Sequence, residues 1–381
     1  MKKKKLNEKK ITILALHLGT GGVEKYLSSL CKMLEGNYEI EIISTYKLSD
    51  KPAFDFSKKI KINYLINEGP CRSELKDAIK KYNVLKVFKY IFKNIKLLFL
   101  KYVKNINAIK KIDSKYVITT RIFHNTLVNN FLSNDGYVKI ATEHNYPTDK
   151  YKQNLINSIS TFNYLVVVSK ELESIYKEEK LHNCKCIYIP NVIDKIPTKK
   201  GRKEANSIIS IGRLSPEKGY SDLIDVINIL KIKNKKIKLY LIGDGSEKES
   251  LENKVKELKL KDNVKLLGFL PFDKCSTYLS KSKIYVMSSY SESFGLVLIE
   301  AMSHKIPCIA FDSASGAREL LGGKRGILTS DRNKEKMADE INKLLKNSKS
   351  YNKYSEVGYE YSKEYLITNV KKKWLKLIKE K

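Results

Sequence analysis

SSYSESFGLVLIEAMS, at residues 288–303, follows a short apolar run, Lys283–Met287, with the composition of a buried strand. A polar turn comes next, and Phe294–Met302 then has the pattern of a helix opening. Two carboxylates bracket this opening. Glu292 lies in the turn, and Glu300 lies a little under two turns inside the helix, at about 3.6 residues per turn. The first N–H groups of a helix have no partner within it. Strand, turn and helix start therefore predict a binding site for an anion.

The two carboxylates indicate which anion this site would take. A carboxylate repels a phosphate but accepts hydrogen bonds from hydroxyl groups. Hydroxyls on both sides of a phosphate are the arrangement of a nucleotide sugar, with ribose at one end and hexose at the other. The alternative is that Glu292 is a helix cap and Glu300 a solvated helix residue.

The pattern E-S-F-G-L-x-x-x-E-A-M, which begins at Glu292, resembles the signature of glycosyltransferase family 4, the retaining, nucleotide-sugar-dependent glycosyltransferases of the GT-B fold. The resemblance implies an α/β protein in which two Rossmann-like, doubly wound parallel-sheet domains face each other across a cleft. It also implies that Glu292 contacts the donor sugar in catalysis and that Glu300 contacts the ribose. The amides between them would hold the diphosphate, which adds four donor-binding residues: Ser293, Phe294, Gly295 and Leu296.

The composition limits the class of partner. At 381 residues the chain is long enough for two domains, and its apolar fraction of 42% is ordinary for a globular protein. Its 73 Lys and Arg against 42 Asp and Glu leave a formal charge of +31, which favours an anionic partner such as nucleic acid, a membrane surface or a phosphorylated substrate.

No apolar run reaches about 18 residues, so no transmembrane helix is expected. The basic N-terminus leads into a predicted strand rather than a signal peptide.

The cysteines and acidic residues predict no metal centre. Six cysteines are scattered along the chain, as in a cytosolic protein with reduced, partly buried thiols. Cys184 and Cys186 with His182 form half of a metal site at most, because no second ligand pair has suitable spacing.

Alternating apolar and helical stretches in the first half predict a doubly wound parallel sheet. The predicted strands are Ile11–Leu18, Tyr38–Tyr46, Lys59–Ile66, Tyr116–Thr120, Val138–Thr142 and Tyr164–Val168. After the first strand, Gly19-Thr-Gly21-Gly22 leads into a predicted helix at Val23–Leu34. Glu24 stands where the dinucleotide fingerprint would have its third glycine. The loop resembles the N-terminal loop of the family, which makes Gly21 and Gly22 donor-binding candidates; the alternative is a close turn without a ligand.

Lys80–Lys111 contains ten lysines and no acidic residue. Val87, Ile91, Ile95 and Leu98 line one face of the predicted helix, with lysines on another. This pattern is typical of a basic amphipathic helix on an anionic membrane surface. The alternative is a helix packed on the core with a solvated lysine face. Nucleic acid is not expected as a partner, because no recognition motif accompanies the charge.

Thr142-Glu143-His144-Asn145 follows directly after a predicted strand, at the edge where α/β sheets bind ligands. A histidine there can donate through one ring nitrogen and be oriented through the other. The resemblance implies that His144 contacts the donor sugar near the reaction centre. A hydrogen-bonded structural histidine is the alternative.

A polar run at Lys195–Asn206 predicts the linker between an N-terminal domain, 1–194, and a C-terminal domain, 195–364. Predicted strands in the second half are Ser207–Ile211, Lys238–Ile242, Val264–Leu267, Lys283–Met287 and Ile306–Phe311. By resemblance the N-terminal domain binds the acceptor and the C-terminal domain binds the donor. The helix Tyr365–Lys381 would then cross back to the N-terminal domain.

Arg213 and Lys218 lie in a glycine-bounded loop after the predicted strand Ser207–Ile211. An arginine can grip two phosphate oxygens at once, and a lysine supplies a mobile point charge. The loop resembles the family's G-R-x-x-x-x-K-G segment, whose Arg and Lys bind the diphosphate. Gly243, after the next strand, lies beside the donor pocket by the same resemblance. These charges neutralise the leaving group and no D-x-D segment is present at a strand end, so no metal requirement is expected.

The sequence thus predicts a retaining transferase that moves a hexose or N-acetylhexosamine from a nucleotide sugar, expected to be UDP-linked, with no further cofactor. The expected acceptor is a lipid-linked or membrane-proximal glycan of capsule, lipopolysaccharide or other surface polysaccharide. The expected location is cytoplasmic and peripheral at the inner face of the membrane. Two rivals remain: a basic nucleic-acid- or membrane-binding protein on a Rossmann-like scaffold, and a sugar epimerase or phosphorylase of the same fold.

Overall fold

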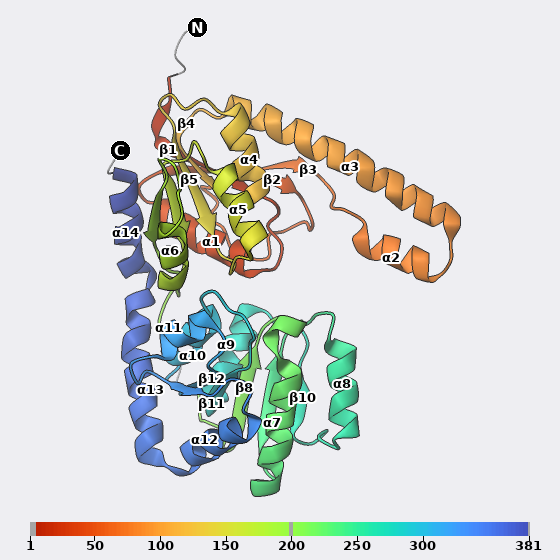
Figure 1. Ribbon diagram of the computed structural model, residues 1–381, viewed down its shortest axis with the longest axis vertical. Helices are drawn as coiled ribbons and strands as arrows, with labels where there is room; N and C mark the ends of the chain where they lie inside the picture. Colours follow the sequence, from red (N-terminus) through yellow and green to blue (C-terminus); the bar gives the residue numbers. More distant parts are fainter. Residues whose placement is uncertain (1–4, 198–200, 380–381) are drawn as a thin grey trace. The chain divides into compact units, whose positions relative to one another are not determined.

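The computed structural model describes residues 5–197 and 201–379, which form two compact units, each built on one β-sheet (Figure 1). The first unit takes in the chain up to Val167, Glu173–Ile189 and the chain from Lys371 onward. The second unit takes in Val168–Leu172 and Pro190–Val370.

The sheet of the first unit has seven strands in the order β3-β2-β1-β4-β5-β6-β7, with all neighbours parallel. Its strands are β1 (Asn7–Ala15), β2 (Glu39–Tyr46), β3 (Lys61–Ile66), β4 (Ser114–Thr119), β5 (Val138–Glu143), β6 (Tyr164–Val167) and β7 (Lys185–Tyr188). The helices of this part of the chain are α1 (Gly22–Leu34), α2 (Arg72–Lys80), α3 (Val84–Lys111), α4 (Ile122–Phe131), α5 (Asp149–Ser158) and α6 (Lys170–Lys177). The last six residues of β1 are buried, as expected for a central parallel strand.

The sheet of the second unit has six strands in the order β10-β9-β8-β11-β12-β13, again all parallel. Its strands are β8 (Ser207–Ile211), β9 (Lys238–Ile242), β10 (Val264–Leu266), β11 (Ile284–Met287), β12 (Cys308–Phe311) and β13 (Ile327–Thr329). Its helices are α7 (Tyr220–Lys233), α8 (Lys248–Glu257), α9 (Phe272–Lys281), α10 (Leu296–Ser303), α11 (Ser315–Leu321), α12 (Lys334–Lys346) and α13 (Ser348–Ser362), and α14 (Ile367–Lys379) ends the described chain. Numbered from its own first strand, the second sheet has the order 3-2-1-4-5-6, and the first sheet has the same order with a seventh strand added at its end. The predicted pair of doubly wound parallel sheets is therefore confirmed.

Three local predictions differ from the structure. The strand expected at Ile11–Leu18 begins at Asn7 and ends at Ala15. The helix expected over Lys80–Lys111 is broken, because Tyr82 has a left-handed φ of 50° and α3 starts afresh at Val84. The side chain of Asn83 caps this new start by accepting a hydrogen bond from the Lys86 amide at 3.1 Å. The edge strands β7 and β13 were not predicted, because neither is a buried apolar run: β7 has no buried residue, and Thr329 is the one buried residue of β13.

Candidate active site

Two loops meet at the carboxyl edge of the second sheet. β8 leads into the loop Gly212–Gly219, and its neighbour β11 leads into the loop Ser288–Gly295. The chain winds outward in opposite directions from β8 and β11, so these strands form the point where the strand order reverses. Open α/β sheets bind their ligands in the crevice at this point.

The loops bring Lys218 and Glu292 together in an ion pair. Lys218 Nζ lies 2.5 Å from Glu292 Oε2, and the two side chains are 23% and 22% exposed. The backbone of each partner is fixed as well. The Ser288 hydroxyl donates to the Lys218 carbonyl at 2.8 Å, and the Gly316 amide donates to the Glu292 carbonyl at 2.8 Å. Two predicted site residues, 74 positions apart, are thus held at one point that solvent still reaches.

Arg213 supplies a second cation at the same strand end. Its side chain is exposed, and in the described chain no side chain forms a hydrogen bond or ion pair with its guanidinium. The loop beneath it is fixed by backbone hydrogen bonds, among them Gly212 N–H to Ile242 O at 2.9 Å and Leu214 N–H to Asp244 O at 3.0 Å. Arg213 therefore combines a rigid backbone with a guanidinium that is open to an anionic ligand.

Gly243 has a packing role in this loop. Its φ is 148°, and a Cβ there would lie 1.8 Å from the Gly212 carbonyl oxygen. A larger residue would push apart the loops after β8 and β9. Close approach of two backbones explains this glycine, and its place in the donor-binding set stays a prediction.

Helix α10 begins later than predicted. Gly295 is its N-cap with a left-handed φ of 83°, so Phe294 and Gly295 precede the helix, which starts at Leu296. Phe294 is buried, and its ring packs edge-on against Tyr365 with centroids 5.7 Å apart. Ser293 is also buried. The amides available to an anion are therefore those around Gly295 and the first turn of α10. Glu300 lies in the second turn and is 9% exposed, so it is not the solvated helix residue of the alternative interpretation.

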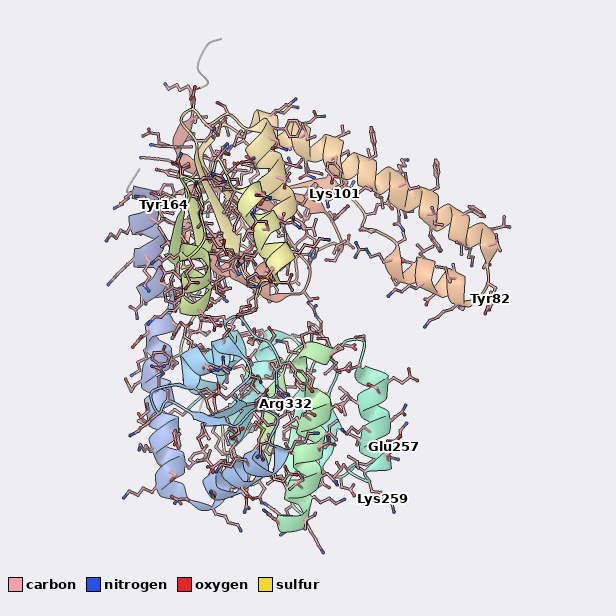
Figure 2. The ribbon with its side chains drawn as sticks, viewed as in Figure 1. Tyr82, Lys101, Tyr164, Glu257, Lys259 and Arg332 are labelled. Carbon is pink, nitrogen blue, oxygen red and sulfur yellow. The ribbon has the colours of Figure 1, made fainter. Side chains whose placement is uncertain are left out.

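Arg332 holds the loop after β11, and sequence reasoning missed it. Its guanidinium donates to the carbonyls of Ser288 and Ser289 at 2.8 and 2.9 Å and to the Ser313 hydroxyl at 2.7 Å. Arg332, which is labelled in Figure 2, also pairs with Asp222 at 3.0 Å. One side chain thereby joins the loops after β11 and β12 to helix α7, and it fixes the segment that ends in Glu292.

Two aromatic rings pack against the guanidinium of Arg332. The guanidinium carbon lies 3.7 Å from the centroid of Tyr290 and 4.6 Å from that of Phe311, and the Tyr290 hydroxyl donates to Asp222 at 2.7 Å. No local sequence signal reveals these contacts, because Arg332 follows a strand of three residues and, apart from the adjacent Asp331, its partners lie 19 to 110 positions away.

In the first unit the glycine loop after β1 is shaped by Glu24. This buried carboxylate accepts a hydrogen bond from the Arg121 guanidinium at 3.1 Å and lies 3.6 Å from His17 Nδ1. A Cβ on Gly21 would lie 2.2 Å from the same carboxyl group, whereas a Cβ on Gly22 would meet nothing within 4 Å. At the position of the third fingerprint glycine this chain thus has Glu24, which forms an ion pair with Arg121. Arg121 lies between β4 and α4, and the sequence did not indicate it as the partner.

His144 lies directly after β5 in the first unit. Its Nε2 is 3.1 Å from the Thr142 hydroxyl, and its ring meets the Tyr26 ring edge-on at 4.3 Å. Burial, with a smaller contribution from Arg121, lowers the pKa of His144 to about 3. The imidazole is therefore neutral at pH 7. It can orient a hydroxyl by hydrogen bonding, but it carries no positive charge.

Glu143 fixes the turn that presents His144. Its carboxylate accepts hydrogen bonds from the amides of His144 and Asn145 at 2.7 and 2.6 Å and from the Tyr151 hydroxyl at 2.7 Å. This anchoring was not foreseen from the sequence, which gave Glu143 no role.

The potential metal ligands of the described residues do not form a cluster. Across residues 5–197 and 201–379, no three His, Cys, Asp or Glu side chains lie close enough to hold an ion. Burial raises the pKa of the Cys184 and Cys186 thiols to about 12, so both stay protonated. In the same described ranges no helix has the length and apolar character that crossing a membrane requires.

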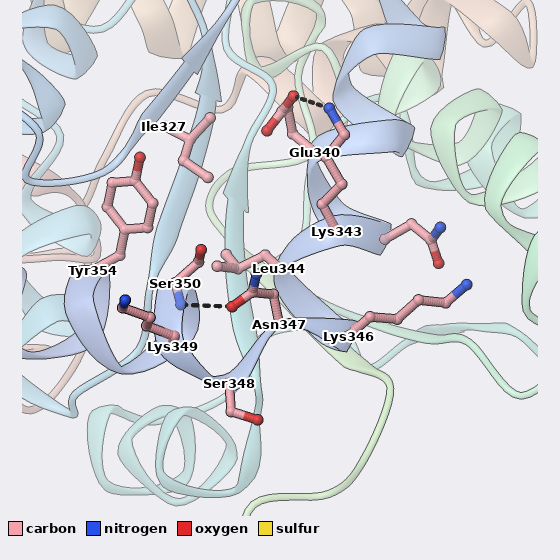
Figure 3. Close-up of a pocket in the computed structure, with 11 residues that line it drawn as sticks. Ile327, Glu340, Lys343, Leu344, Lys346, Asn347, Ser348, Lys349, Ser350 and Tyr354 are labelled. Carbon is pink, nitrogen blue, oxygen red and sulfur yellow. Dashed lines mark hydrogen bonds and ion pairs between the residues drawn. The ribbon is translucent and has the colours of Figure 1, made fainter.

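A surface hollow between α12 and α13 lies away from this chemistry (Figure 3). It is lined by Glu340, Lys343, Asn347, Ser350 and Tyr354 and reaches Ile327, the first residue of β13. It therefore opens at the amino edge of the sheet, opposite the loops that carry Arg213 and Glu292. The carboxyl edge remains the candidate site.

Comparisons with known proteins show which family the second unit resembles. Residues 192–361 match the family described as Glycosyl transferases group 1. An uncharacterized glycosyltransferase of Haemophilus influenzae is 27% identical over 374 residues, which cover 96% of this chain and 99% of that protein. The N-acetylgalactosamine-N,N'-diacetylbacillosaminyl-diphospho-undecaprenol 4-alpha-N-acetylgalactosaminyltransferase of Campylobacter jejuni is 26% identical over 377 residues, with 93% and 95% covered.

The structural comparison concerns the fold alone. A TarM variant of S. aureus, solved in complex with fondaparinux, alpha-GlcNAc-glycerol and UDP, has a TM-score of 0.78 to this structure at 17% identity. The match covers 97% of this chain and 99% of that one. Residues 192–361 of this chain thus belong to the group 1 glycosyltransferases, and its two parallel sheets have the GT-B fold.

Proposed function

We propose that this protein transfers a hexose or N-acetylhexosamine from a UDP-sugar to a lipid-linked or membrane-proximal glycan, with retention at the anomeric carbon, in the synthesis of capsule, lipopolysaccharide or another surface polysaccharide. The proposal rests on one observation: the loops after β8 and β11, where the strand order of the second sheet reverses, carry Arg213, Lys218 and Glu292. Two cations suit a diphosphate, and a carboxylate beside them suits a sugar hydroxyl.

The proposed reaction is a front-face displacement. The acceptor oxygen forms a bond to the anomeric carbon as the bond to the donor phosphate breaks, and the departing phosphate takes the acceptor proton. Negative charge grows on that phosphate, where Arg213, Lys218 and the amides at the start of α10 stabilise it. Glu292 and the neutral imidazole of His144 orient the hexose, and Glu300 binds the ribose. The proposal needs no metal ion, because these cations do the neutralising.

The first test measures UDP and GDP release from a panel of nucleotide sugars, with and without a chelator. We expect slow hydrolysis of one UDP-sugar that the chelator does not change. The panel also names the sugar. If no donor is turned over and UDP does not raise the unfolding temperature, the transferase proposal fails and the binding-protein rival gains. Release that needs inorganic phosphate would favour a phosphorylase.

Membrane attachment is proposed through an aromatic stripe on α3, defined as Leu85, Phe88, Phe92, Ile95, Phe99 and Tyr102. The three- and four-residue spacing puts these side chains on one helix face, and Phe88, Phe92 and Phe99 are 67%, 73% and 68% exposed. Only Leu97, Asn105 and Ile109 are buried within α3, which contradicts the core-packed alternative for most of the helix. Ile91, Ile95 and Leu98 of the predicted face are also exposed, so the apolar surface of α3 extends beyond the aromatic stripe.

An anionic bilayer fits this surface better than a second copy of the chain. The stripe is flanked by lysines such as Lys89 and Lys96, and α3 has no acidic residue. Two copies would bring like charges together, whereas anionic lipid neutralises them while the aromatic rings enter the interface.

Replacing Phe88, Phe92 and Phe99 by serine is therefore expected to lower binding to phosphatidylglycerol vesicles at least tenfold, because most of the apolar contact is lost. Co-sedimentation measures the effect. Ile232→Ser is the matched control, since Ile232 is 82% exposed on α7 of the other unit. Unchanged vesicle binding in the triple variant contradicts the proposal, and a dimer in light scattering that this variant loses would assign the stripe to a second copy.

A further inference from the structure

Helix α3 is much longer than the sheet on which it packs. Its 28 residues span about 42 Å at 1.5 Å per residue, whereas β2 and β3 have 8 and 6 residues. Leu97 packs with Tyr46 and Ile66, the last residues of those two strands. Leu97 therefore marks the carboxyl edge of the first sheet, and the N-terminal half of α3 projects beyond this edge (Figure 1).

Lys101 lies one turn after Leu97, at the same edge. Its Nζ is 3.6 Å from the ring centroid of Phe123, in the first turn of α4, and it is partly buried (Figure 2). Phe123 also meets the ring of Tyr102 edge-on at 5.3 Å, and Tyr102 ends the aromatic stripe. The stripe thus leads directly to this lysine.

Arg72 completes a cation pair, which we define as Lys101 and Arg72. Arg72 follows β3, begins α2 and is exposed. The pKa of Lys101 is lowered, first by burial and then by the nearby charge of Arg72. The amide of Cys71, the residue before Arg72, donates to Asn94 of α3 at 2.9 Å. Asn94 lies about two turns before Lys101 on the same face of α3, so the start of α2 packs on the helix face that carries this partly buried lysine.

The cation pair has no protein counter-ion. In the described chain no carboxylate forms an ion pair with Lys101 or Arg72. Neighbouring cations are paired: Arg121 with Glu24 at 3.1 Å, and Lys93 with Glu68 at 2.6 Å. A partly desolvated charge without a counter-ion is costly, and a bound anion would offset that cost.

We propose that Lys101 and Arg72 bind a phosphate that links the acceptor glycan to its lipid, so that the acceptor class is a lipid phosphate or diphosphate glycan. The inference rests on the proposed function. The cation pair lies at the carboxyl strand edge, where α/β units bind ligands. It also lies where the aromatic stripe ends, so a lipid tail among the rings would bring its first phosphate to Lys101.

Binding of farnesyl diphosphate to the full chain, without vesicles, tests this inference by calorimetry, with farnesol as the uncharged comparison. We expect binding of the diphosphate but not of farnesol. Lys101→Met, which keeps the alkyl packing on Phe123, and Arg72→Gln should each weaken it at least tenfold. Lys111→Gln, an exposed lysine at the other end of α3, is the matched control and should change the affinity less than twofold.

Equal affinity in the wild type, Lys101→Met and Arg72→Gln overturns the acceptor assignment. So does loss of phosphatidylglycerol vesicle binding in these variants while farnesyl diphosphate still binds, because the pair would then serve lipid headgroups. UDP release by the wild-type protein in the same preparation tests the proposed function separately. A protein that releases UDP but binds no farnesyl diphosphate refutes this inference and leaves the transferase assignment intact.

Discussion

Arg213→Met is expected to lower the rate of sugar transfer at least a hundredfold while leaving the fold unchanged. The guanidinium is exposed and has no intramolecular partner in the described residues, so its loss removes no contact of the folded protein. In the proposed mechanism it removes a donor to the growing charge of the leaving phosphate, and deleting one such donor typically lowers the rate by about 10²–10³. UDP release under saturating donor gives the rate, and thermal unfolding gives the stability.

Arg213→Lys is the control that separates charge from geometry. A lysine keeps the charge but not the two parallel N–H groups, so we expect its rate to lie between those of the wild type and Arg213→Met. Turnover of Arg213→Met within fivefold of the wild-type value would contradict the role assigned to this residue.

Glu292→Gln is expected to reduce transfer at least a hundredfold and to leave UDP binding equal or tighter. The amide has the size of the carboxylate but cannot hold Lys218 by charge, so the ammonium is released toward the diphosphate. Misorientation of the hexose accounts for the lost rate. The pair is partly exposed, and its loss should lower the free energy of unfolding by no more than about 1 kcal/mol. Calorimetry with UDP and turnover of the donor measure the two effects.

Opposite effects on binding and turnover distinguish a catalytic Glu292 from a structural one. A merely structural carboxylate would lower UDP affinity and stability together when replaced. Lys218→Met is the reciprocal variant: it should weaken UDP binding, and in the Lys218→Met/Glu292→Gln double variant any gain in UDP binding should vanish. Wild-type transfer by Glu292→Gln would refute the proposed active site.

The sequence predicted the fold well because its strands are apolar runs that end in glycine or polar turns. Ser207–Ile211 and Lys238–Ile242 are found at the predicted bounds. The breaks were harder to foresee, since the left-handed φ of Tyr82 interrupts a continuous helical pattern and Gly295 delays the start of α10. Backbone conformation at single residues decides such boundaries, and residue periodicity carries little information about it.

The candidate site was predictable where chemistry lies in short motifs and unpredictable where it depends on distant contacts. Arg213, Lys218 and Glu292 follow from strand ends and family pattern. The direct ion pair of Lys218 with Glu292, the Arg121–Glu24 contact and the six distant groups around Arg332 join residues far apart in the chain. A single sequence does not show which of many charged residues will meet.

The return of the chain to the first unit at Lys371 restricts how genes of this family can recombine. Trp374, the sole tryptophan, is fully buried in the part of α14 that belongs to the first unit. A single crossover at the linker between the units would combine the first unit with the α14 of another protein. The side chain at the buried site of Trp374 would then come from that other protein. An exchange of the unit proposed to bind the acceptor therefore needs a second crossover in the segment that encodes α14, because this unit is built from two separated pieces of sequence.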